Sequence, residues 1–240
     1  MFRQTPNSSS KKELPSSLYD YMERPKTLAP DAYWDQVRRT TKGQAFSEDQ
    51  IKLLRDAMEQ TLGLTLKDSL LDLCCGNGAL VGPLFSRLGG YLGVDMSPVL
   101  IAVGQRDFQR SGSHEFIVSG VNDFLAAEKF PEKYTLVSWC CAFQYLSIDD
   151  ATDAIHLLYK RFINVEKIFI SEIPDAAKAT SFFYNQDEYQ LEDHTSAMGR
   201  WYFTEELAAI CERLGWKAEI QKLPESFHQA YYRFSLALTR

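Results

Sequence analysis

A glycine turn and an acidic residue further along the chain are the parts of this sequence that point to chemistry. The segment LLDLCCGNGAL, residues 70–80, is an apolar run that leads into Gly76-Asn77-Gly78. Glycine tolerates backbone angles that side chains forbid, and it lets a ligand lie against the main chain. Asp95, in the segment LGVDMSP, ends the next apolar run. A glycine turn with an acid at a strand end is typical of a nucleoside site, in which the carboxylate binds the ribose hydroxyls.

Strands and helices that would position these residues alternate along the chain. Apolar runs predict five strands, at residues 69–74, 91–96, 115–119, 134–140 and 165–173. Helical spacing and capping residues predict helices from Ser47 to residue 62, from the glycine turn to residue 88, from Ser97 to about residue 110, near residues 123–129, and from Ser147 onward. This alternation indicates a parallel sheet with helices on both faces, and ligands bind at the carboxyl ends of such strands.

The segments outside this pattern are expected to cover the sheet or to extend beyond it. Residues 1–17 are polar and predict a disordered tail, residues 18–46 predict a cap of short aromatic helices, and residues 47–240 form the main domain. The insertion at residues 174–203 is rich in aromatic residues and is expected to be a substrate lid. A helix from Thr204 to Gly215 precedes strands at 216–222 and 229–239, which predict a hairpin and therefore one antiparallel edge strand.

Composition narrows the classes of function. The chain has 240 residues, is 45% hydrophobic and carries a net charge of −6, which argues against nucleic acid as the main partner. Its sequence has no apolar run long enough to span a membrane and no apolar signal-peptide centre near its start, so we expect a cytoplasmic protein. The five cysteines include the adjacent pairs Cys74-Cys75 and Cys140-Cys141, a spacing that favours reduced thiols over disulfides or a metal site.

Over residues 45–240 the chain resembles the class I S-adenosylmethionine-dependent methyltransferases. The segments that carry this resemblance are LLDLCCGNG, LGVDMSP, KYTLVSWCCAFQYLS and KIFISEIP, in that order. The resemblance implies a three-layer, Rossmann-like α/β fold with a seven-stranded mixed sheet, order 3-2-1-4-5-7-6, in which strand 7 is antiparallel. It also implies that the cofactor, S-adenosyl-L-methionine, lies across the carboxyl ends of the first two strands.

The same resemblance assigns cofactor-binding roles to particular positions. Asp95 matches the acid that binds the ribose, and Met96 matches the apolar neighbour that packs on adenine. Cys140 stands at the end of the fourth strand, where the backbone faces the methionine group. An acid near adenine is expected soon after the third strand, where the chain reads SGVNDFL, so Asn122, Asp123 or only the backbone around Val121 makes this contact. The positions that match the first motif are Asp72, Cys74, Gly76 and Gly78.

The implied activity is methyl transfer to an O or N atom of a small-molecule metabolite. No catalytic base is evident, and Glu172, His194 and His228 are the candidates because they fall near the expected substrate side. The sequence is compatible with a homodimer.

Two alternatives to the methyltransferase function are also compatible with the sequence. One is a nicotinamide-dependent oxidoreductase, because Gly76 and Gly78 with Gly82 also fit a loose dinucleotide fingerprint; the other is a non-catalytic S-adenosylmethionine sensor or partner subunit.

Overall fold

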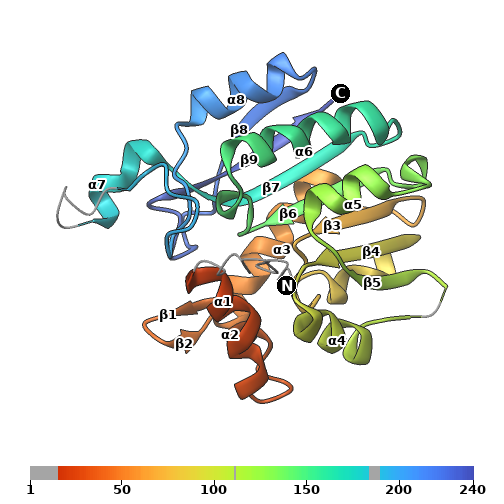
Figure 1. The fold of residues 1–240 in the computed structure, drawn as a ribbon, viewed down its shortest axis with the longest axis horizontal. Coiled ribbons are helices and arrows are strands. Elements are labelled where there is room, and N and C mark those ends of the chain that lie inside the picture. Colours follow the sequence, from red (N-terminus) through yellow and green to blue (C-terminus); the bar gives the residue numbers. More distant parts are fainter. Residues whose placement is uncertain (1–15, 111, 184–189) are drawn as a thin grey trace, which may run out of the picture.

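The structure is a computed structural model that describes residues 16–110, 112–183 and 190–240 (Figure 1). The expected disordered tail therefore lies outside the described residues except at its end, where Ser16 begins helix α1 (Ser16–Glu23). Within the described ranges, no helix is long and apolar enough to cross a membrane. The same ranges contain no group of three or more His, Cys, Asp or Glu side chains placed to hold a metal ion.

Seven strands of the described chain form one mixed sheet in the order β5-β4-β3-β6-β7-β9-β8. This is the order implied by the resemblance, and it confirms the expected fold class. Neighbouring strands from β5 to β7 pair in parallel, whereas β9 pairs antiparallel with both β7 and β8. The strands are β3 (Ser69–Leu73), β4 (Gly90–Asp95), β5 (His114–Val118), β6 (Leu136–Cys140), β7 (Lys167–Pro174), β8 (Lys217–Lys222) and β9 (Arg233–Thr239).

The expectation of an antiparallel edge strand is wrong, because the antiparallel strand β9 lies inside the sheet and β8 forms the edge. The sequences of the two strands explain this order. In β9 every residue from Arg233 to Leu238 is buried, whereas β8, KAEIQK, has no buried residue. A charged, half-exposed strand is suited to an edge, and an apolar strand must be covered on both sides.

Helices cover both faces of the sheet, and alternate strand residues supply the two cores. Leu71 and Leu73 of β3 belong to the larger cluster, whereas Leu70 belongs to the cluster on the other side. The larger cluster contains side chains of α5 (Val121–Ala127), α6 (Ile148–Arg161) and α8 (Thr204–Arg213). The second contains side chains of α3 (Glu48–Leu62), the 3₁₀-helix η2 (Gly82–Arg87) and α4 (Pro98–Asp107).

The connection after the glycine turn differs from its prediction. A helix was expected up to residue 88, but the chain forms turns through residue 81 and then only η2. Pro83 lies more than one turn into the expected helix, where it has no N–H to donate to the carbonyl oxygen of Ala79. Phe108 also packs so closely on Gly82 that a Cβ there would lie 2.5 Å from the ring. An α-helix therefore does not form, and the tighter 3₁₀ turn replaces it.

The N-terminal segment, residues 16–46, lies at the end of the sheet where the parallel strands finish (Figure 1). After α1 it contains the 3₁₀-helix η1 (Arg24–Thr27) and α2 (Tyr33–Gln36), as expected for short helices. It also contains a hairpin of β1 (Thr40–Thr41) and β2 (Gln44–Ala45), which is too short to give a periodic signal. At the same end lie the described parts of the insertion, residues 174–183 and 190–203, with the 3₁₀-helix η5 (Ala176–Lys178) and α7 (Ala179–Phe182). The remaining 3₁₀-helices are η3 (Pro131–Lys133) and η4 (Phe143–Tyr145).

Candidate functional site

The glycine turn follows β3 directly and has the backbone conformation that its sequence predicts. Gly76 and Gly78 have φ angles of 59° and 77°, in the left-handed region that glycine adopts without strain. Because the two glycines have no side chains, a different neighbouring residue can pack closely against each of them. A Cβ on Gly76 would lie 2.7 Å from Cγ1 of Val37 in the N-terminal segment, and one on Gly78 would lie 2.5 Å from the ring of Phe116. Gly76 therefore faces the segment that covers the turn, and Gly78 faces the core.

Asp95 ends β4 beside this turn, and two backbone N–H groups orient its carboxylate. The amide of Gly76 donates to Oδ2 over 2.9 Å, and the amide of Ser97 donates to Oδ1 over 2.8 Å. The hydroxyl of Tyr21 donates to Oδ2 as well, over 2.9 Å. Burial raises the pKa of Asp95, while these donors favour its charged form. The result is a fixed hydrogen-bond acceptor at the carboxyl edge of the sheet.

Asp72 lies deeper, within the sheet, and its two oxygens are bound by neighbouring strands. Ser138 Oγ of β6 donates to Oδ1 over 2.6 Å, and Tyr91 OH of β4 donates to Oδ2 over 3.0 Å. Burial raises the pKa of Asp72 to about 6, although both hydrogen bonds lower it. Asp72 therefore links β3 to the strands on either side of it, directly beneath the glycine turn.

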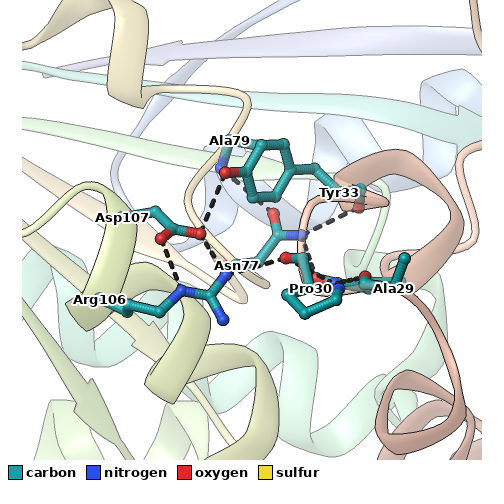
Figure 2. Close-up of polar contacts among 8 residues, drawn as sticks. Ala29, Pro30, Tyr33, Asn77, Ala79, Arg106 and Asp107 are labelled. Atoms are coloured by element: carbon teal, nitrogen blue, oxygen red, sulfur yellow. Dashed lines mark hydrogen bonds and ion pairs between the residues drawn. The ribbon is translucent and has the colours of Figure 1, made fainter.

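Side chains of the turn and of α4 hold the N-terminal segment, as Figure 2 shows. Asn77 Nδ2 donates to the carbonyl oxygen of Tyr33 over 2.9 Å and to Gln36 Oε1 over 3.0 Å. Arg106 Nη2 donates to the carbonyl oxygen of Pro30 over 2.9 Å, and the hydroxyl of Tyr33 donates to Asp107 over 3.0 Å. The sequence analysis did not identify these contacts, because they join positions that no local pattern relates.

A protein-family model described as a methyltransferase domain matches residues 70–162, a range that includes the glycine turn, Asp95 and Cys140. Residues 70–162 form a class I, S-adenosylmethionine-dependent methyltransferase domain. The expected family, enzyme class and cofactor are thereby confirmed. No curated protein matches the chain significantly.

Solved structures share the fold of this chain at low sequence identity. Magnesium protoporphyrin IX methyltransferase from Synechocystis, solved with bound SAH, is 14% identical with a TM-score of 0.58, over 94% of this chain and 95% of that one. A TehB-like SAM-dependent methyltransferase from Corynebacterium glutamicum is 17% identical with a TM-score of 0.55, over 88% and 97%. The small RNA methyltransferase HEN1 is 14% identical with a TM-score of 0.58, over 84% of this chain and 26% of that one.

The residues expected near adenine lie directly after β4 and in the first turn of α5. The side chain of Met96 is 39% exposed, directly after Asp95. Asn122 Nδ2 donates to the carbonyl oxygen of Asp150 over 3.0 Å, and its buried Oδ1 has no hydrogen-bond partner among the described residues. Asp123 is exposed in the first turn of α5. An unpaired amide oxygen suits contact with a base that carries an N–H donor.

The ends of β6 and β7 carry a second polar group of residues, which contains Cys140 and Glu172. Arg39 Nη1 lies 2.7 Å from both carboxylate oxygens of Glu172, and the two side chains are only 7% and 1% exposed. Arg233 Nη1 donates to the carbonyl oxygen of Glu172 and lies 3.8 Å from Cys141 Sγ. Glu172 has a φ angle of 64°, so contacts on both its side chain and its carbonyl hold an unfavourable backbone conformation. The sequence analysis named Glu172 but not its arginine partners.

The two adjacent cysteine pairs lie at the carboxyl ends of the neighbouring strands β3 and β6. Cys74-Cys75 follows β3, and Cys140-Cys141 includes the last residue of β6. Burial raises the pKa of Cys74 and of Cys140, and the negative charges of Asp95 and Glu172 add to the respective shifts. Both side chains are therefore neutral thiols near pH 7. Thiols in this state pack as small, weakly polar groups and are poor nucleophiles, which suits a lining role.

The two candidate histidines lie in different places. His228 Nε2 lies 2.7 Å from Thr41 Oγ1, and its Nδ1 lies 2.6 Å from Gln50 Oε1. Since the amide oxygen of Gln50 can only accept, Nδ1 carries the proton and Nε2 accepts from Thr41. Burial lowers the pKa of His228, in keeping with this neutral form. His194 lies in the turn next to Asp193, within the insertion at residues 174–203.

Proposed function

We propose that this methyltransferase transfers a methyl group from S-adenosylmethionine to an O or N atom of a small molecule. The observation that carries the proposal is the carboxylate of Asp95, which the amides of Gly76 and Ser97 fix beside the glycine turn. A ribose has two adjacent hydroxyls that can donate to such a carboxylate. Oδ2 of Asp95 already accepts an O–H donor, that of Tyr21, so its surroundings suit a hydroxyl.

The other cofactor contacts of the proposal follow the same edge of the sheet. The methionine part would lie against the backbone between Gly76 and Cys140, and the adenine between Met96 and Asn122. Asp72 would act from below, because its bonds to Ser138 and Tyr91 fix β3 between β6 and β4. Each of these residues sets a position and none takes part in bond making, so their contribution would be one of alignment.

When bound, S-adenosylmethionine supplies a methyl group on a positively charged sulfur, and the group is displaced in line by the acceptor. The task of the protein is to align the acceptor and to exclude water, which can contribute about 7–11 kcal/mol in well-oriented reactions. The N-terminal segment and the described parts of the insertion, residues 174–183 and 190–203, lie at the end of the sheet where this would happen (Figure 1). We propose that they form the walls of the acceptor site.

A general base is needed only where the acceptor must lose a proton. Glu172 is bound to Arg39, and both ring nitrogens of His228 are hydrogen bonded. Either residue would have to break these contacts to accept a proton from an acceptor. We therefore propose that alignment, rather than a base among these two, provides most of the rate enhancement, and His194 remains the candidate from the insertion.

The acceptor side offers polar contacts of its own. Arg233 Nε and Gln144 Oε1 are buried and have no hydrogen-bond partner among the described residues. Other atoms of both side chains approach Cys141 Sγ, at 3.8 and 4.0 Å. Buried polar atoms without partners are costly unless a ligand or water satisfies them. We propose that the acceptor presents a hydrogen-bonding group to this pair.

The charge of the chain supports a small molecule over a nucleic acid as the acceptor. The net charge is −6, whereas proteins that bind phosphate backbones usually present a basic face. Among the similar structures, HEN1 is by its name a small RNA methyltransferase, but the likeness to it extends to the fold alone. The nicotinamide-dependent alternative has no support from the family match or from the strand order.

Calorimetric titration of the wild type and of Asp95→Ala with S-adenosylmethionine, S-adenosylhomocysteine and NADPH tests the proposal. We expect micromolar binding of the first two by the wild type and none of NADPH. Loss of charge-assisted hydrogen bonds should weaken binding to Asp95→Ala by about tenfold to a hundredfold. Asp56→Ala, which removes an exposed carboxylate on α3, is the matched control and should bind as the wild type does. Equal affinities of Asp95→Ala and the wild type would overturn the ribose assignment.

A further inference from the structure

The hydroxyl of Tyr21 occupies a place that the proposed function needs for the cofactor. It donates to Asp95 Oδ2 over 2.9 Å, and it would lie 3.7 Å from a Cβ on Gly76. The hydroxyl therefore sits between the glycine turn and the carboxylate. These are the two groups against which a ribose would bind.

The hydrogen bonds to Asp95 leave little capacity for a ribose while Tyr21 is present. Oδ2 accepts from Gly76 N–H and from Tyr21 O–H, which uses both lone pairs of that oxygen. Oδ1 accepts from Ser97 N–H and has one lone pair left. Burial, together with the charge of Asp95, raises the pKa of Tyr21, so its hydroxyl stays protonated and remains a donor. A ribose with two hydroxyls can bind in full only where Tyr21 has withdrawn.

The N-terminal segment is held unevenly along its length. Its later part is fixed by the buried ion pair of Arg39 with Glu172 and by the hydrogen bonds of Asn77 to α2 (Figure 2). The side chains of α1 that the structure describes begin at Asp20; apart from the hydrogen bond of Tyr21 to Asp95, they show only an exposed ion pair from Asp20 to Arg38, at 3.6 Å, as a link to the later part of the segment. An exposed pair of this kind contributes about 0–1 kcal/mol, whereas breaking a buried pair costs several times more. α1 can therefore leave the turn while residues 33–46 stay in place.

We propose that Tyr21 competes with the ribose for Asp95, so that S-adenosylmethionine binds only after α1 has moved off the glycine turn. The inference rests on the proposed function, because it requires that Asp95 is the ribose-binding acid. The competition would lower the apparent affinity for the cofactor by a definite factor. When only a fraction of molecules has α1 withdrawn, the apparent affinity for the cofactor falls by that fraction.

The substitution Tyr21→Phe tests the competition, because it removes the hydroxyl and keeps the ring. We expect S-adenosylhomocysteine to bind Tyr21→Phe about tenfold more tightly than the wild type, the effect of losing one charge-assisted hydrogen bond. In stopped-flow measurements the whole gain should appear in the association rate constant, with the dissociation rate constant unchanged. The reason is that Tyr21 does not contact the bound cofactor in this scheme.

The matched control is Tyr33→Phe, which removes a phenol-to-carboxylate hydrogen bond, to Asp107, from the same segment. Its affinity should stay within about twofold of the wild type, since this bond is exposed and does not involve Asp95. A thermal melt of each variant, compared with the wild type, shows that it is folded before its affinity is compared.

Unchanged or weaker binding by Tyr21→Phe would overturn the inference, and weaker binding would mean that the hydroxyl contacts the cofactor directly. A gain confined to the dissociation rate constant would overturn it too. These outcomes are separate from a failure of the proposed function. If Asp95→Ala binds as the wild type does, or if no variant binds, the ribose assignment fails; if Asp95→Ala loses affinity and Tyr21→Phe does not gain it, only the competition fails.

Discussion

The two ends of the carboxyl edge of the parallel strands, at β3–β4 and at β6–β7, are built in different ways. At β3 and β4, the backbone amides of Gly76 and Ser97 hold Asp95, and Gly76 and Asp95 are 19 positions apart. At β6 and β7, side chains hold one another, and Arg39 and Glu172 are 133 positions apart. The first end depends on local turn geometry. The second depends on contacts that exist only once the N-terminal segment has docked.

This difference separates binding of the cofactor from closure of the site. A carboxylate held by backbone amides keeps its position whichever side chains surround it. A buried ion pair between two segments fixes one segment on the other, and it is costly to break because an unpaired charge is left behind. We infer that the β3–β4 end supplies a constant cofactor contact, while the β6–β7 end fastens the cover above it.

The largest effect is expected from breaking the second end. Arg39→Ala leaves the carboxylate of Glu172 buried without its partner, so the free energy of unfolding should fall by about 3–5 kcal/mol. Urea denaturation of the variant and the wild type measures this loss.

The matched control is the double variant Arg39→Met, Glu172→Met, which removes both charges and keeps apolar volume at the two positions. It should recover most of the loss, because replacing a buried ion pair by apolar groups is often neutral. A loss below about 1 kcal/mol for Arg39→Ala would show that the ion pair does not fasten the segment.

A smaller, pH-dependent effect on the free energy of unfolding is expected from Asp72, which lies beneath the β3–β4 end. The pKa of Asp72 is about 6 in the folded protein, above its ordinary 3.8, so the folded state binds the proton more tightly than the unfolded state. The stability from this group is complete below pH 4 and is lost as the pH rises through 6, by roughly 3 kcal/mol.

The substitution Asp72→Asn removes this titration. The difference in unfolding free energy between the wild type and Asp72→Asn should therefore change by roughly 3 kcal/mol between pH 4 and 7, in favour of the variant at the higher pH. Denaturant titrations at several pH values measure the difference, and other titrating groups cancel in it. A difference that is constant with pH would contradict the raised pKa of Asp72.

The structure of the β3–β4 end could be predicted from the sequence, whereas the side-chain contacts of the β6–β7 end could not, and the reason is physical. Helix caps and glycine turns are decided within a few residues. Ser47, Ser97 and Ser147 each accept from the predicted amide three residues later. Gly76 and Gly78 have the positive φ angles that a glycine turn implies. These features are local, and a single sequence contains all the information that they need.

The contacts of Arg39, Arg233 and Tyr21 could not be predicted in this way. Each joins segments that are far apart in the chain, and a single sequence does not say which segment lies over which strand end. The helix expected after the glycine turn failed for a similar reason, because the ring of Phe108 fills the space next to Gly82. The interior place of β9 could have been found from its apolar residues, Phe234 and 236–238, whereas the charged β8 resembles an edge strand.

The smallest effect is expected at the outer contact of the second end. Thr41 on the N-terminal hairpin donates to His228, which Gln50 of α3 holds from the other side. A double-mutant cycle of Thr41→Val and His228→Ala should give a coupling energy of about 0.5–1.5 kcal/mol in unfolding, the ordinary range for one hydrogen bond. Affinity for S-adenosylhomocysteine should stay unchanged in both single variants. Zero coupling would mean that this contact adds nothing to the fastening of the segment.

A crystal structure of the wild type with S-adenosylhomocysteine bound would test the ribose site and the competition by Tyr21 together. We expect the ribose hydroxyls to donate to Asp95, Tyr21 to have left this carboxylate, and Arg39 still to pair with Glu172. A ligand bound away from Asp95 would contradict the assignment of the cofactor site. A ribose on Asp95 with the hydroxyl of Tyr21 still in place would keep that site and contradict the competition.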